Sequence, residues 1–269
     1  MIATLPGLRM AYDDQGRGLP VVFLHAFPLD RSLWRHQRVA LSPRVRCIVP
    51  DLRGFGESDA HGPYSMDQYA DDVVALLDHL EIERAVVCGL SMGGYIAMAM
   101  WRRHPSRIRA LVLCDTRATA DSEAARASRG ELMALAQAEG AAAVAARQLP
   151  GALGATTHAQ RPELVAGVCA IMARQPVAGI VGALTALRDR PDSRPTLGSI
   201  SVPTLVLVGD EDTVTPPFDA EAMLALLPPE AEARVERIAQ AGHLSCLERP
   251  AAVTHAIAEL LAALAPDRE

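Results

Sequence analysis

"AVVCGLSMGGYIAMAM", residues 85–100, carries one serine among glycines directly after a short apolar run. The apolar run is typical of a buried strand, and the residues from 93 onward have the composition of a helix. Ser91 is therefore expected on a tight strand-to-helix turn, where Gly89, Gly93 and Gly94 leave room for the backbone. We interpret Ser91 as an exposed nucleophile at the N-terminus of a helix. The competing interpretation is an incidental serine in a glycine-rich loop.

Four other apolar segments resemble the one at 85–91. Each is continuous rather than alternating in polarity, as in strands buried on both faces of a parallel sheet. They are VVFLHAF (21–27), VRCIVPD (45–51), RALVLCD (109–115) and PTLVLVGD (203–210). Helical spacing of apolar residues is found at 66–80, 93–105 and 250–264. This alternation predicts an α/β protein with a mostly parallel, doubly wound sheet.

The alternation stops between residues 118 and 196, where the sequence is Ala-rich, helical in character and without a convincing strand. The segment RPDSRPTLGSISVP (190–203) has the composition of a linker back into the sheet. We therefore predict a core formed by residues 1–117 and 197–269, interrupted by a helical insertion at 118–196.

Composition excludes several classes of function. The formal net charge of −6 argues against binding to a nucleic-acid backbone. The N-terminus lacks the pattern of a secretory signal, and no apolar run is long enough to span a bilayer, so we expect a soluble cytoplasmic protein. The five cysteines are scattered and have no metal-ligand or redox spacing, which favours inert buried thiols. The oligomeric state is left open.

A serine hydroxyl needs a base to remove its proton. Among the eight histidines, His243 lies in AQAGHLSCLERP, a polar loop between the possible strand ARVERIA (233–239) and the last helix. A loop after the final strand can bring its imidazole to the sheet edge that presents Ser91. His243 is therefore the predicted base, and a solvated or structural role is the default for the other histidines.

The base in turn needs a carboxylate to orient it. LVLVGDEDTVTPP follows a predicted strand, and Asp212 in this loop is the favoured candidate. Asp115 is the rival, because it too follows directly after a predicted strand. With Asp212 the order along the chain is Ser, Asp, His.

An acyl-transfer site also needs donors for the oxyanion. The segment LHAFPLD (24–30) follows an early strand, and the backbone N–H of Phe27 is expected to pair there with that of Met92, the residue after the nucleophile. We assign His25 a structural role in tying down this loop. No metal or organic cofactor is predicted, since neither a His-Glu-x-x-His motif nor a dinucleotide fingerprint occurs.

Taken together, HAFP, DLRGFGES (51–58), GLSMGGY, GDEDTVTP and AGHLSCLERP resemble, in order and spacing, the motifs of the α/β-hydrolase superfamily over nearly the whole chain. The resemblance implies an α/β-hydrolase fold in which the insertion at 118–196 is a helical cap over the active site. HAFPLDRSLW with DLRGFGES looks most like small bacterial carboxylesterases and 3-oxoadipate enol-lactonases. One departure is Ala26, where the family usually has glycine, and its methyl group is expected to narrow the oxyanion loop.

The leading hypothesis is a serine hydrolase that cleaves a carboxylic ester or lactone of a small molecule through Ser91, His243 and Asp212. An enol-lactonase acting on a carboxylate-bearing substrate is one alternative, with counter-charge from arginines of the insertion. These are Arg126, Arg129, Arg147 and Arg174. Pro28 follows the predicted oxyanion donor, a position in which the sequence resembles haloperoxidase-like members of the superfamily. Perhydrolysis is therefore a further alternative. The non-enzymatic alternative is a ligand receptor that reuses the fold.

Overall fold

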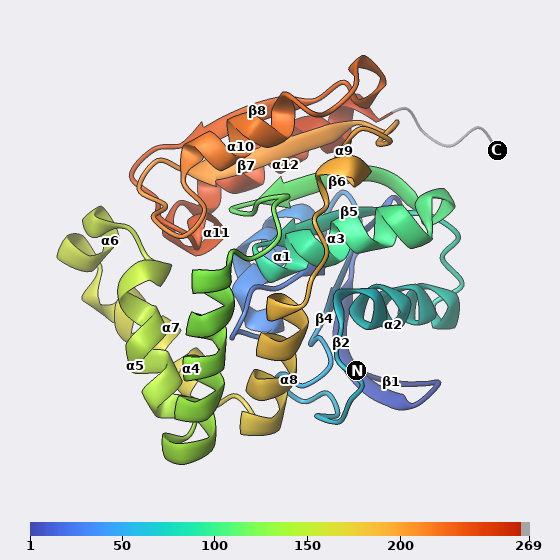
Figure 1. Ribbon diagram of the computed structural model, residues 1–269. Coiled ribbons are helices and arrows are strands. Elements are labelled where there is room, and N and C mark those ends of the chain that lie inside the picture. Colours follow the sequence, from blue (N-terminus) through green and yellow to red (C-terminus); the bar gives the residue numbers. More distant parts are fainter. Residues whose placement is uncertain (265–269) are drawn as a thin grey trace.

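The computed structural model describes residues 1–264. An eight-stranded sheet forms its centre, in the order β1-β2-β4-β3-β5-β6-β7-β8 (Figure 1). All neighbours from β4 to β8 are parallel, whereas β1 and β2 pair antiparallel with each other and β2 with β4. The strands are β1 (Ile2–Leu5), β2 (Leu8–Gln15), β3 (Pro20–Leu24), β4 (Arg46–Pro50), β5 (Ala85–Leu90), β6 (Ile108–Cys114), β7 (Thr204–Gly209) and β8 (Arg234–Ile238). The predicted mostly parallel α/β sheet is confirmed.

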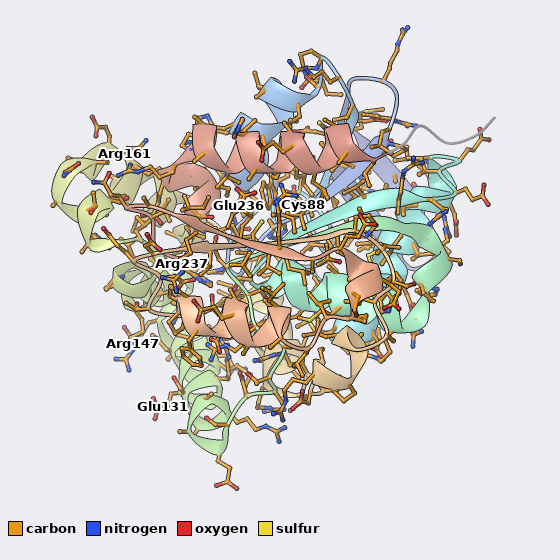
Figure 2. All side chains as sticks on the ribbon, turned by 90° about the horizontal axis from the view of Figure 1, so that it is seen from above. Cys88, Glu131, Arg147, Arg161, Glu236 and Arg237 are labelled. Atoms are coloured by element: carbon orange, nitrogen blue, oxygen red, sulfur yellow. The ribbon has the colours of Figure 1, made fainter. Side chains whose placement is uncertain are left out.

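Helices cover both faces of the sheet because the central strands are apolar on both sides. In β3, Val22 and Leu24 pack in the same core as α2 (Met66–His79) and α3 (Met92–Arg103). The intervening residues of β3 pack in a second core with α1 (Arg35–Leu41) and α12 (Pro250–Ala263). Figure 2 shows α12 on one side of the sheet and α10 (Pro217–Leu224) on the other, with Cys88 between them. The continuous apolar runs are thus explained by burial in two layers.

The antiparallel strands β1 and β2 were not expected from the sequence. They form a hairpin around Gly7, whose φ of 70° suits glycine. The strand β1 alternates exposed and buried residues over only four positions, which is too short a pattern to distinguish from a loop. The sheet is therefore extended at one edge beyond the predicted parallel part.

Six helices and no strand lie between residues 115 and 203, all of which the structure describes. They are α4 (Glu123–Glu139), α5 (Ala141–Ala152), α6 (Ala155–Gln160), α7 (Pro162–Ala173), α8 (Val177–Arg188) and α9 (Arg194–Leu197). Helices α4 to α7 gather beside the sheet as a group of their own (Figure 1). The helix α9 crosses the predicted boundary at 196, in the segment expected to be a linker. The boundaries of the cap stay a prediction.

Within residues 1–264, no single helix has the length and apolar composition that crossing a membrane requires. Only the bent pair α7 and α8, with 94° between its helices, passes that test, and it does so by length and composition alone.

Candidate active site

Ser91 lies between β5 and α3 with a φ of 52° and a ψ of −108°, a backbone conformation that non-glycine residues rarely adopt. Three contacts hold this strained turn in place. The Ser91 N–H donates to the Cys114 carbonyl at 2.9 Å, and the Ser91 carbonyl accepts from the Gly94 N–H and the Thr116 hydroxyl, both at 2.9 Å. The backbone is therefore fixed by the neighbouring strand β6, and the hydroxyl is left for other contacts.

The three glycines around Ser91 are required by close backbone packing. A Cβ atom on Gly89 would lie 2.2 Å from the Gly93 carbonyl oxygen, and one on Gly93 would lie 2.2 Å from the Leu24 carbonyl oxygen. A Cβ on Gly94 would lie 2.6 Å from the Thr116 side chain. The strand, the turn and the helix thus meet at distances that only glycine allows, as the sequence predicted.

The structure brings Ser91, His243 and Asp212 together from three distant parts of the chain. His243 Nε2 lies 2.9 Å from Ser91 Oγ, and His243 Nδ1 lies 2.8 Å from Asp212 Oδ2. The histidine is on the loop between β8 and α11 (Ser245–Glu248), and the aspartate is on the loop after β7. Both side chains are buried: that of His243 is 8% exposed and that of Asp212 is 0% exposed. This geometry allows a proton to pass from the serine to the imidazole.

Asp212 is held as an ionised acceptor. Burial opposes its charge, but His243 and hydrogen bonds from His243 and Thr215 outweigh burial and lower the pKa of Asp212. Asp212 Oδ1 accepts from the N–H groups of Val214 and Thr215 at 2.8 and 2.9 Å, and Oδ2 accepts from the Thr215 hydroxyl at 2.7 Å. The loop therefore fixes the carboxylate that faces Nδ1 of the imidazole.

Asp115, the rival carboxylate, is directed elsewhere. It follows β6, is fully buried, and accepts hydrogen bonds from the Gly209 N–H at 2.9 Å and the Ser245 hydroxyl at 2.6 Å. Burial, followed by the nearby charge of Asp212, raises the pKa of Asp115 well above its usual range. Asp115 thus links the end of β7 to the segment after His243.

The loop after β3 contains the predicted oxyanion donor Phe27, which lines the same cavity as Ser91. Met92 begins α3, so its N–H belongs to the first turn, where helical carbonyls are lacking as partners. His25 ties the loop down: its Nε2 lies 3.0 Å from the Leu52 nitrogen and its Nδ1 lies 3.0 Å from the Ala26 carbonyl oxygen. Burial lowers the pKa of His25, which fits a neutral imidazole that accepts at Nε2 and donates at Nδ1.

The segment DLRGFGES joins the core to α8, a helix of the predicted cap. Arg53 and Asp72 form a buried ion pair at 2.6 Å. Gly54 has a φ of 89°, and its backbone contacts α8: a Cβ on Gly179 would lie 1.7 Å from the Gly54 carbonyl oxygen. This segment is structural, and it seats α8 against the core.

The cavity that contains Ser91 and His243 is small, with a volume of about 60 Å³. The core contributes Phe27, Tyr95 and Arg117, among others. Helices of the predicted cap supply Arg129, Gln148, Ala152, Met172 and Leu187. The insertion therefore forms part of the wall around the hydroxyl.

Of the four arginines of the insertion proposed as counter-charges, only Arg129 lines this cavity. It pairs with Asp121 at 3.2 Å. Arg126 and Arg147 are exposed, and Figure 2 shows Arg147 at the outer side of the molecule. Arg174 is also exposed and pairs with Asp30 at 2.6 Å, outside the cavity.

Arg117, which was not predicted from the sequence, follows β6 and lines the cavity from the core. Its Nη2 donates to the Val214 carbonyl, while its buried Nε lacks a hydrogen-bond partner among the described residues. Asp219 is the facing carboxylate, 3.8 Å from this Nε. Arg117 therefore brings a positive charge to the wall of the cavity. Only its place two residues after Asp115, near a strand end, marked it in the sequence.

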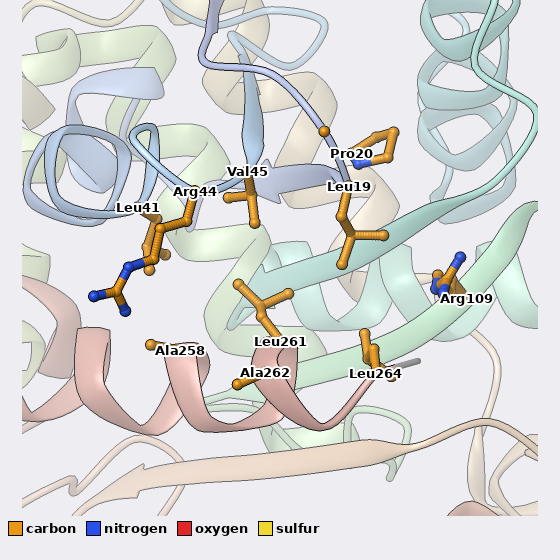
Figure 3. A pocket seen from close by; sticks show the side chains of 11 residues that line it. Leu19, Pro20, Leu41, Arg44, Val45, Arg109, Ala258, Leu261, Ala262 and Leu264 are labelled. Atoms are coloured by element: carbon orange, nitrogen blue, oxygen red, sulfur yellow. The ribbon is translucent and has the colours of Figure 1, made fainter. Parts of the chain in front are cut away.

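Another cavity, of about 460 Å³, lies at the N-terminal ends of the parallel strands, away from the ends that carry the predicted site (Figure 3). It is lined by the start of β3, the loop before β4 and the end of α12, including Leu19, Val45 and Leu261. None of the predicted site residues lines it. Within residues 1–264, no group of three or more His, Cys, Asp or Glu side chains is arranged to hold a metal ion.

Comparison with known proteins agrees with this fold. The chain is 39% identical to a thermophilic esterase from Thermogutta terrifontis, solved with malate bound, with 98% and 99% of the two chains covered and a TM-score of 0.95. It is 31% identical to the enol-lactonase from Burkholderia xenovorans LB400, with 97% and 100% coverage and a TM-score of 0.90. It is also 30% identical to 3-oxoadipate enol-lactonase 2 of Acinetobacter baylyi, over 88% of this chain and 86% of that protein.

Residues 20–250 match the family model described as the alpha/beta hydrolase fold. The protein belongs to this family, and the resemblance noted in its motifs is confirmed.

Proposed function

We propose that the protein is a serine hydrolase that cleaves a small carboxylic ester or lactone through an acyl-enzyme intermediate. The observation that carries this proposal is the contact of His243 with Ser91 on one side and Asp212 on the other, at 2.9 and 2.8 Å. The general class, a carboxylic ester hydrolase or lactonase, is confirmed by the esterase and enol-lactonases to which the chain is similar.

In this mechanism His243 removes the proton of Ser91 as the hydroxyl attacks the substrate carbonyl, and Asp212 stabilises the imidazolium. The N–H groups of Met92 and Phe27 stabilise the oxyanion. His243 then protonates the leaving oxygen, and the acyl-enzyme forms. A water molecule, activated by the same imidazole, releases the acid and restores the serine.

A fluorophosphonate probe tests this proposal, because it reacts only with an activated serine. We expect intact-mass measurement to show one adduct on the folded protein, and peptide mapping to locate it on Ser91. A ligand receptor has no need to activate that hydroxyl. Folded protein without an adduct would therefore favour the receptor over the hydrolase.

A carboxylate-bearing substrate, as in the enol-lactonase alternative, is favoured by Arg117 and Arg129. Both line the cavity that contains Ser91, so two guanidinium groups lie at its wall. The related esterase was solved with malate, a dicarboxylate, bound. The small cavity favours a short acyl group. Perhydrolysis and the cytoplasmic location stay predictions from the sequence.

Replacing Arg117 or Arg129 by glutamine is expected to lower kcat/KM for a carboxylate-bearing ester by about 10- to 100-fold. This is the value of a charge-assisted hydrogen bond of about 1.5–3 kcal/mol. Activity on a neutral ester of equal length is expected to change by less than about threefold, since that substrate makes no such bond. Arg126→Gln is the matched control, because Arg126 lies on the same helix as Arg129 but is exposed. Equal losses on both substrates would contradict anion recognition.

A further inference from the structure

Glu248 is a buried carboxylate that the mechanism above does not use. It lies at the end of α11, in the motif AGHLSCLERP, and its exposed fraction is 1%. Its Oε1 accepts from the N–H of Gly242 at 2.9 Å and from the N–H of Leu244 at 3.3 Å. These two residues are the immediate neighbours of His243 along the chain. One oxygen atom therefore holds the backbone on both sides of the imidazole.

The second oxygen of the same carboxylate reaches the cap. Glu248 Oε2 accepts from the N–H of Gly154 at 2.8 Å. Gly154 directly precedes α6, and its backbone packs against that of Gly242: a Cβ on Gly242 would lie 2.2 Å from the Gly154 nitrogen. Two glycines facing each other thus let one carboxylate bond to the cap and to the histidine loop at once.

Neighbouring contacts strengthen this junction. Glu211, which directly precedes Asp212, accepts hydrogen bonds from the N–H of Thr156 at 2.8 Å and from its hydroxyl. Arg161, which directly precedes α7, donates to the Glu248 carbonyl at 2.8 Å. The start of α6 is therefore anchored both beside the histidine and beside the aspartate of the site.

We propose that Glu248 is a positioning residue that fixes His243 relative to Ser91 and couples the imidazole to the position of the cap. The inference rests on the proposed function. Replacing a buried carboxylate leaves the backbone N–H groups that face it without acceptors. The free-energy cost of such unsatisfied donors is larger than that of losing one ordinary hydrogen bond. A displacement of about 1 Å at a catalytic group costs on the order of 100-fold in rate. Glu248 touches neither substrate nor Ser91, so its effect is exerted through the histidine loop.

The test compares Glu248→Gln with Glu211→Gln. Glutamine keeps the size of Glu248 but turns an NH₂ group toward either the histidine loop or Gly154, and one set of contacts is lost. We expect Glu248→Gln to lower kcat per fluorophosphonate-titrated site, and the rate of Ser91 labelling, by about 10- to 100-fold. KM is expected to stay within about threefold. Glu211→Gln neutralises the other carboxylate that bonds to the start of α6 without touching the groups beside His243, so its kcat is expected to remain within about threefold of the wild type.

Three results would overturn the inference. One is Glu248→Gln that melts at a lower temperature but keeps the wild-type kcat per titrated site, which indicates a purely structural role. Another is an equal loss of kcat in Glu211→Gln, which indicates cap anchoring alone. The third result applies if Glu248→Gln does not fold. Glu248→Asp is then the variant to measure, because its side chain keeps the carboxylate but is one methylene too short to reach both partners. A wild-type kcat per titrated site in Glu248→Asp would overturn the inference. Failure of the proposed function is distinguishable, because the wild-type protein would then not be labelled at all.

Discussion

Replacement of Ser91 by alanine is expected to lower kcat for ester hydrolysis by about 10⁶-fold, to the level that binding and oxyanion stabilisation alone can sustain. Without the hydroxyl there is no acyl-enzyme, and His243 has no nucleophile from which to accept a proton. The fold should persist, because alanine is no larger than serine and the contacts of this turn are made by its backbone. The measurement is kcat with short-chain nitrophenyl esters, together with thermal unfolding of both proteins.

Ser106→Ala is a suitable control for this experiment, since Ser106 is exposed and lies beyond the C-terminal end of α3, whereas Ser91 precedes its N-terminal end. It should match the wild type in kcat and in unfolding temperature. A Ser91→Ala protein that turned over the same esters at a rate similar to the wild type would refute the assigned nucleophile.

Asp212→Asn is expected to lower kcat by about 10⁴-fold. The amide presents an N–H to His243 Nδ1, which favours the tautomer with the proton on Nε2. That nitrogen faces Ser91 Oγ at 2.9 Å, and once protonated it can no longer accept the serine proton. The measurement is the pre-steady-state rate of acylation, which isolates this step from release of the acid.

The matched variant is Asp115→Asn, because Asp115 is the buried carboxylate that follows the neighbouring strand β6. Its oxygens bond to Gly209 and Ser245 rather than to the imidazole. Its replacement should therefore lower the free energy of unfolding by about 1–3 kcal/mol while most of kcat is retained. If Asp115→Asn lost 10⁴-fold in kcat and Asp212→Asn did not, Asp115 would be the acid.

The sequence could indicate Ser91 and His243 from their motifs, but it could only favour Asp212 over Asp115 and left Asp115 as a rival. The glycines at 89, 93 and 94 indicate the turn in the sequence, because they lie close to Ser91 in the chain and the steric overlap that Gly89 avoids is with Gly93. Asp115 and Asp212 both follow directly or closely on strands that are neighbours in the sheet. Only the direction of each side chain distinguishes them, and that direction depends on loops that meet in three dimensions.

Residues that act across the junction of core and cap were the least predictable. Arg117 follows a strand like many solvated arginines, and its buried Nε results from the packing of α10 and the loop at Val214. Among the cap arginines, the helical phase that brings Arg129 inward and leaves Arg126 outside is set by packing of Ala-rich helices with weak amphipathic patterns. The hairpin of β1 and β2 was missed for a similar reason, since only its pairing with β4 makes it part of the sheet.

The glycine contacts at the two ends of the cap bear on how this protein can acquire new specificity. Gly179 meets Gly54 at one end, and Gly154 meets Gly242 at the other, in each case at distances that exclude a side chain. The contacts that attach the predicted cap to the core are thus made by backbone atoms, whereas its surface toward the cavity is made by side chains such as Gln148 and Met172. Substitutions of these cavity-lining side chains, in evolution or in a mutant library, can therefore change specificity while the two pairs of glycines keep the helices attached.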